Sequence, residues 1–98
     1  FEVVNLEKDS VTLRWKKPKY DGGSQIINYI VEKREEFKDD WSKVKQLDKY
    51  ILTHEVKGLV PDKKYGFRVS AKNSIGVGEP AELQESVVPS RPVGKSNI

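Results

Sequence analysis

Apolar and polar residues alternate along most of this chain with a period of two. In residues 10–16 the apolar positions are Val11, Leu13 and Trp15, and polar or charged side chains fall between them. Because successive side chains of a β-strand point to opposite faces, this alternation predicts a strand with one buried face. We expect these three side chains to face a core.

Three longer segments and three shorter ones continue the same alternation. The longer segments, with the side chains expected to face the core, are 26–35 (Ile27, Tyr29 and Val31), 50–56 (Tyr50, Leu52, His54 and Val56) and 65–73 (Tyr65, Phe67, Val69 and Ala71), and the shorter ones are 2–6, 41–47 and 82–88.

Clusters of turn-forming residues separate these segments, and no segment has the apolar spacing and caps of an amphipathic helix. Short strands at regular spacing with turns between them are typical of antiparallel sandwiches. The pattern therefore predicts an all-β fold, a seven-stranded antiparallel Greek-key β-sandwich. An odd number of alternating strands would let the chain enter at one end and leave at the other.

Composition narrows the possible functions. The chain has 98 residues, a formal net charge of +3 and no cysteine. The absence of cysteine excludes disulfides, thiolate zinc sites and cysteine nucleophiles, and it favours a reducing compartment. Basic and acidic residues interleave, whereas nucleic-acid-binding domains concentrate basic charge on one face. No apolar run reaches the roughly 18 residues of a membrane span. We therefore predict neither nucleic acid nor membrane as a partner.

Two glycine motifs resemble ligand loops. Gly22 and Gly23 could cradle a phosphate with backbone N–H groups, but no helix and no Lys-Ser/Thr pair follows them. The run "GVGEPA" (76–81) fits a dinucleotide fingerprint, which works only where a helix begins in a βαβ unit. Pro80 and the short remaining chain exclude that unit. We interpret both motifs as turns.

Two further features carry chemical groups. His54 is the single histidine, and its place in an alternating segment predicts a histidine at the edge of the core. The run "EEFKDD" (35–40) gathers four carboxylates but lacks the ligand spacing of an EF-hand, so we expect a solvated hairpin loop. We predict no catalytic, cofactor-binding or metal-binding residues, and no cofactor.

A family resemblance rests on the second half of the chain. Several positions resemble the corresponding positions of fibronectin type III modules. They are Leu59, Pro61 and Tyr65, Trp15 on the second strand, and the hairpin "AKNSIGVGEPA". The resemblance implies that the Tyr65 hydroxyl bonds to nearby backbone at one end of the sandwich, and that Trp15 lies in the core. It covers residues 1–89, which we take as the domain, with 90–98 as a C-terminal inter-domain linker.

A narrower resemblance rests on "WKKPKYDGGSQIINYIVEKRE" and the tryptophan after it. This run is similar to fibronectin type III modules of giant sarcomeric proteins such as titin, twitchin and projectin, although many of those modules have proline where this chain has Gln25. The matching positions are Pro18, Asp21, Gly22, Gly23, Ser24, Ile26, Tyr29, Val31, Glu32, Lys33, Arg34 and Trp41.

The narrower resemblance implies a non-catalytic structural and interaction module in a tandem array of a cytoplasmic sarcomere protein. Such a module acts as a spacer, a scaffold and a unit that carries mechanical load. Its partners would be neighbouring immunoglobulin and fibronectin type III modules, with thick-filament proteins such as myosin as further candidates. The isolated domain would be monomeric, and the parent protein could carry a separate kinase domain.

Two surface features each have two interpretations. Trp41 either packs against the edge of the sandwich, which we favour, or stays partly exposed for a partner. The basic residues either gather into a patch for an acidic partner or, as we favour, form a solvated face. They are Lys16, Lys17, Lys19, Lys33 and Arg34.

Two competing functions are weighed against this one. An extracellular adhesion or receptor module has the same fold, but the chain has no Arg-Gly-Asp, and "WSK" (41–43) is only a fragment of a cytokine-receptor motif. An enzyme would need a nucleophile set, a carboxylate pair or a metal cluster with supporting spacing. The enzyme that we consider as the alternative is a hydrolase whose activity depends on His54.

Overall fold

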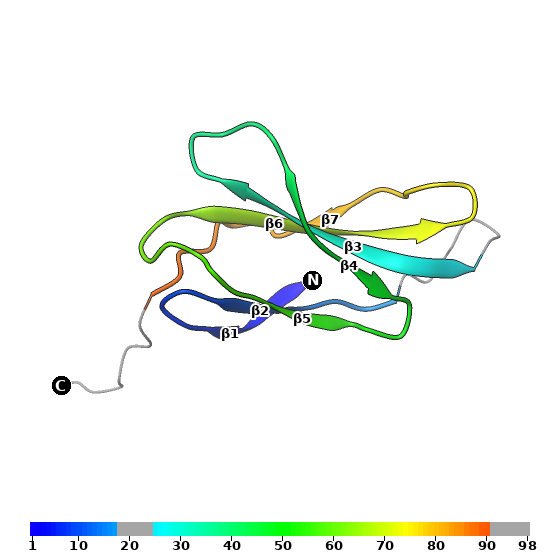
Figure 1. The fold of residues 1–98 in the computed structure, drawn as a ribbon, viewed down its shortest axis with the longest axis horizontal. Helices are drawn as coiled ribbons and strands as arrows, with labels where there is room; N and C mark the ends of the chain where they lie inside the picture. The colour runs from blue at the N-terminus through cyan, green and yellow to red at the C-terminus, as the bar shows by residue number, and fades with distance from the viewer. Residues whose placement is uncertain (18–24, 91–98) are drawn as a thin grey trace.

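In the part of the chain that the structure describes, seven β-strands form two antiparallel sheets that pack face to face (Figure 1). The computed structural model describes residues 1–17 and 25–90. The strands are β1 (Glu2–Leu6), β2 (Val11–Arg14), β3 (Ile26–Glu35), β4 (Ser42–Asp48), β5 (Thr53–Val56), β6 (Tyr65–Asn73) and β7 (Ala81–Glu82).

One sheet has the strand order β1-β2-β5 and the other has the order β4-β3-β6-β7. The longest pairing joins β3 to β6, from Ile26 opposite Asn73 to Glu35 opposite Tyr65. The described residues contain no helix. The predicted all-β sandwich is confirmed.

The core lies between the sheets and is built from alternate side chains. Val11, Leu13 and Trp15 are buried, as their alternation predicts. The Trp15 and Tyr29 rings pack across the two sheets with centroids 5.7 Å apart. Among the described residues, the buried core cluster is Val11, Leu13, Trp15, Ile26, Tyr29, Val31, Val56, Leu59, Tyr65, Phe67, Val69 and Val87.

The tyrosine corner implied by Leu59, Pro61 and Tyr65 is present. The Tyr65 hydroxyl accepts a hydrogen bond of 2.9 Å from the backbone N–H of Val60. Leu59 is buried beside it, while Pro61 lies at the exposed turn. A phenol that bonds to the backbone in this way satisfies a polar oxygen while its ring fills the core.

The inward face predicted for β3 is wrong at one position. Ile27 is 46% exposed, whereas Ile26 is buried, and Tyr29 and Val31 are buried as expected. The pairing of β3 with β6 shifts between Ile26 and Asn28. An irregularity of this kind inserts one residue and reverses the side to which the preceding side chain points.

The predicted strand 50–56 is also too long. Tyr50 is 80% exposed and Leu52 is 38% exposed, because β5 begins only at Thr53 and the preceding residues form a turn. Of the predicted inward positions, Val56 is buried and His54 is half-buried.

The predicted strand 82–88 is divided. β7 covers only Ala81–Glu82, and the chain then bends and returns beside β6 at Val87. The backbone N–H and carbonyl groups of Tyr65 and Val87 exchange hydrogen bonds of 2.8 and 2.7 Å. Residues 91–98 of the predicted linker lie outside the described part of the chain.

We expect Trp15→Ala to lower the free energy of unfolding by about 3–5 kcal/mol, because the side chain is 4% exposed and contacts the rings of Phe1 and Tyr29. Chemical denaturation of both proteins measures the change. Val4→Ala, at a 43% exposed position of β1, is the control and should change stability by less than about 1 kcal/mol. A Trp15→Ala midpoint equal to that of the parent would contradict the core assignment.

Candidate interaction surfaces

The outer face of the four-stranded sheet carries a stack built on Trp41. The guanidinium groups of Arg34 and Arg68 lie 4.9 and 4.4 Å from the centre of the Trp41 ring. Gly66 lies beside this ring, and a Cβ atom there would be in ordinary van der Waals contact with it at 3.5 Å. Trp41 thus crosses the outer face from the start of β4 to β6, which differs from the expected packing at the sandwich edge.

Two ion pairs order this sheet. The Arg68–Glu32 pair lies on the outer face with Trp41, whereas Glu35 is opposite the buried Tyr65 and therefore points to the other side of β3. Arg68 donates to Glu32 at 2.7 Å, and the two residues are paired across β6 and β3. Lys63 donates to Glu35 at the end of β3, and this hydrogen bond lowers the pKa of the Glu35 carboxyl. These side chains have structural partners within the domain, which fits a stabilised sheet better than a reactive centre.

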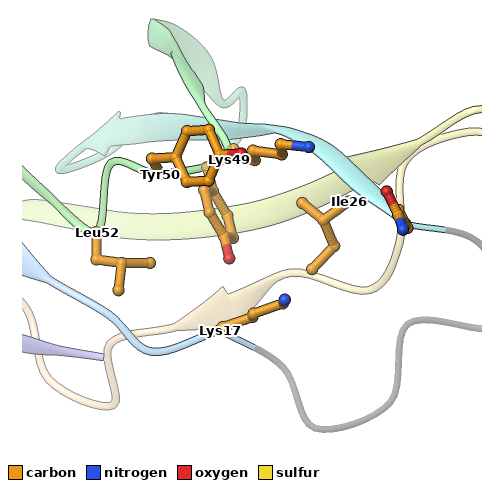
Figure 2. Close-up of a pocket in the computed structure, with 7 residues that line it drawn as sticks. Lys17, Ile26, Lys49, Tyr50 and Leu52 are labelled. Carbon is orange, nitrogen blue, oxygen red and sulfur yellow. The ribbon is translucent and has the colours of Figure 1, made fainter.

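One end of the sandwich contains an open hollow of about 630 Å³ (Figure 2). Lys17 lies on one side of it in that view, and Lys49 and Tyr50 lie on the other. The described residues that line it are Lys17, Gln25, Ile26, Tyr29, Lys49, Tyr50 and Leu52, and among these there are two cations and no carboxylate.

Two turns at this end are held by side chains of the Asp/Asn type. The Asp48 carboxylate accepts the Tyr50 N–H at 3.0 Å, and the side-chain Oδ1 of Asn73 accepts the Ile75 N–H at 2.8 Å. Side chains of Asp and Asn favour such turns because they bond the backbone two residues on. Tyr50 and Ile75 remain 80% and 79% exposed.

His54 lies on β5 at the edge between the two sheets, as expected for a histidine at the border of the core. Burial lowers the pKa of this imidazole, Lys45 acts in the same direction, and Glu55 opposes them. Among the described residues, no group of three His, Asp or Glu side chains could hold a metal ion.

The acidic run 35–40 forms the loop between β3 and β4, as predicted. Glu36 accepts the backbone N–H of Lys64 at 2.7 Å, and Phe37 at the loop tip is 99% exposed with a φ of 66°. Two of the four carboxylates, those of Glu35 and Glu36, thus bond to residues at the start of β6 or just before it.

The glycine motifs have different outcomes. "GVGEPA" follows the bend at residues 74–75 and forms the returning part of the connection between β6 and β7, with Val77 paired with Lys72 and β7 beginning at Ala81. Gly22 and Gly23 lie outside the described residues, so their interpretation as a turn stays a prediction.

The candidate basic residues do not form one patch. Lys17 lines the hollow at the beginning of β3, while Lys33 and Arg34 lie near the other end of that strand. Eight residues of strand separate Ile26 from Arg34, which corresponds to about 26 Å. Lys19 lies outside the described part of the chain. In residues 1–17 and 25–90, no helix is long and apolar enough to cross a membrane.

The sequence comparisons and the structure comparison find similar proteins of the same kind. The family model described as "Fibronectin type III domain" matches residues 1–87. Titin of Drosophila melanogaster is 46% identical over 78 residues, which is 80% of this chain and a share of titin that rounds to 0%. M-protein of striated muscle from Gallus gallus is 36% identical over 83 residues, 85% of this chain and 6% of that protein.

A solved structure of the twitchin kinase region from C. elegans, with segments named Fn31, NL, kin, CRD and Ig26, has a TM-score of 0.81. It is 34% identical, and the match covers 93% of this chain and 16% of that one. This chain therefore spans only a small part of the relatives that it matches.

We expect the stability of this domain to fall as pH drops from about 7.5 toward 5.5, in part through His54. The unfolded imidazole takes up a proton near its ordinary pKa of 6.5, while the folded one has a lowered pKa and resists protonation. His54→Gln should therefore make the pH dependence of the free energy of unfolding shallower in this window. Lys45→Gln should have a smaller effect in the same direction, because it removes one of the two causes. An unchanged slope in His54→Gln would contradict the shifted pKa.

We expect a coupling energy of about 0.5–1 kcal/mol between Arg34 and Trp41, because the cation lies over the ring of the indole. A double-mutant cycle with Arg34→Ala and Trp41→Ala, measured by chemical denaturation, isolates this energy. Arg34 is preferred to Arg68, which also pairs with Glu32. The matched control combines Trp41→Ala with Arg14→Ala on the other sheet, where the effects should add. Additive effects of Arg34→Ala and Trp41→Ala would show that the contact between Arg34 and Trp41 contributes nothing to the free energy of unfolding.

Proposed function

The chain belongs to the fibronectin type III family, and we propose that it is a non-catalytic structural module in a tandem array of a giant muscle filament protein. The observation that carries this proposal is the 46% identity to titin over 80% of the chain. The striated-muscle M-protein and the twitchin region support the same class of parent protein. In this role the module acts as a spacer and scaffold between neighbouring modules.

We place the parent protein in the cytoplasm of muscle cells, at the sarcomere. The relatives are muscle proteins, and a chain without cysteine suits a reducing compartment. Neighbouring immunoglobulin and fibronectin type III modules are the proposed partners, with thick-filament proteins such as myosin as further candidates. Residues 1–89 are the proposed domain, and 90–98 are the proposed linker.

The fold supports a mechanical role. β1 pairs with β2 near the start of the chain, and the last described residues bond to Asp62 and Tyr65. Each backbone hydrogen bond contributes only about 0.5–1.5 kcal/mol. Resistance to tension therefore depends on several of these bonds breaking together, which makes unfolding slow and cooperative.

We expect the domain, when pulled by its two ends between reference modules in a single-molecule experiment, to unfold in one event. The released length should be about 300 Å, because each residue adds at most about 3.3–3.6 Å. Trp15→Ala, which weakens the core, should lower the unfolding force without changing this length. Gradual extension with no discrete event would contradict a mechanical role.

The array itself is tested separately in the parent gene and in muscle. Fibronectin type III or immunoglobulin modules should be encoded on both sides of this segment, and an antibody to it should label sarcomeres as regular stripes. A secretory signal together with labelling at the cell surface would instead establish the extracellular adhesion module.

A further inference from the structure

We propose that the end of the domain that carries Ile27, Tyr50, Ile75 and Val77, here called the apolar end, docks the module that precedes this one in the array. This inference deepens the proposed function and rests on it. The occupant that fits is the end of the preceding module at which its chain leaves that module. We expect this end to present apolar side chains and a carboxylate.

Exposed apolar side chains concentrate at this end. Among the described residues, ten large hydrophobic side chains are exposed, and six of them lie here. Scattered apolar residues are normal on a protein surface, whereas a contiguous group marks an interaction site. The six are Ile27, Tyr50, Ile51, Leu52, Ile75 and Val77.

The strand register brings these residues together. The beginning of β3 lies between the ends of two neighbours, with Asn28 opposite Asp48 of β4 and Ile26 opposite Asn73 of β6. Neighbouring strands are about 4.8 Å apart, so the three strand ends lie within about 10 Å of one another. Figure 1 shows the β4–β5 and β6–β7 turns at the same end of the sandwich.

Hydrogen bonds define the backbone of the two turns that carry these apolar side chains. Asp48 bonds the backbone of Tyr50, and its own carbonyl accepts the Ile51 N–H at 2.9 Å. Asn73 bonds the backbone of Ile75 and of Gly76, and the Asn73 N–H donates to the Gly76 carbonyl at 3.0 Å. A surface ordered before binding loses less conformational entropy when a partner docks.

The direction of the chain selects the preceding module. β1 lies antiparallel to β2, with Glu2 opposite Arg14, and β2 leads toward Lys17 in the hollow. A segment before Phe1 would therefore continue toward the apolar end. The chain leaves at the other end, where the Pro89 carbonyl accepts the Asp62 N–H at 2.9 Å.

Charge defines the rest of the partner surface. Lys17 and Lys49 line the hollow, and none of its lining residues in 1–17 and 25–90 is a carboxylate. Ile26 and Leu52 supply apolar walls (Figure 2). A carboxylate of the docked module would complement these two cations at the rim of an apolar contact.

The test compares this chain alone with a two-module protein that includes the preceding module of the parent chain. We expect the attached module to raise the Tm of this domain by about 4 °C or more. The amide NMR signals of Tyr50 and Ile75 should shift, and those of Val60 should not. The double variant Tyr50→Ser and Ile75→Ser should abolish the rise in Tm while leaving the isolated chain within about 2 °C of the parent.

The matched control is the double variant Phe37→Ser and Val60→Ser, whose side chains are 99% and 53% exposed at the opposite end. This control should retain the full rise in Tm. Equal Tm values and unshifted signals in the two-module protein would overturn docking and leave the array intact. A parent chain with no module before this one would overturn the array proposal itself.

Discussion

The pairing of β3 with β6 is the interaction on which the rest of the structure depends. On its inner side, Tyr29, Val31, Phe67 and Val69 form the part of the core that faces Trp15 of the other sheet. On its outer side, the same two strands supply Arg34, Gly66 and Arg68, which hold Trp41. The two ends of this pairing also set the positions of the turns at both ends of the domain. One strand pair therefore determines the core, the outer face and the geometry of the ends.

The sequence predicts these two strands well because the alternation in β3 and β6 is long, although it does not predict that they pair. The bounds expected for these strands, 26–35 and 65–73, coincide with those observed. Half-buried strands of nine or ten residues leave a clear period of two, since each buried face must be apolar. The tyrosine corner was implied by the resemblance of Leu59, Pro61 and Tyr65 to fibronectin type III modules, and the structure confirms it.

The predictions that are wrong depend on information that alternation does not contain. Ile27 and Tyr50 both keep the parity of a core position, but an irregular pairing reverses the first and a turn contains the second. The site of Trp41 depends on its contacts with Arg34 and Arg68, and Arg68 is 27 positions away in the chain and on β6, two strands away from β4 in the sheet. A signal for the turns was present, since Asp48 and Asn73 each precede an apolar residue by two positions.

The exposed residues of the apolar end differ from ordinary surface side chains in how they are held. A flexible loop could fold Tyr50 or Ile75 back onto the domain and so bury apolar area, which is worth about 25 cal/mol per Å². The hydrogen bonds from Asp48 and Asn73 fix the local backbone and oppose this collapse. The turn chemistry thus keeps apolar area exposed that the domain does not use for its own core. Such an arrangement lowers the entropic cost of a contact with another module, and a contact at the entry end would transmit tension between modules through packed side chains as well as through the linker.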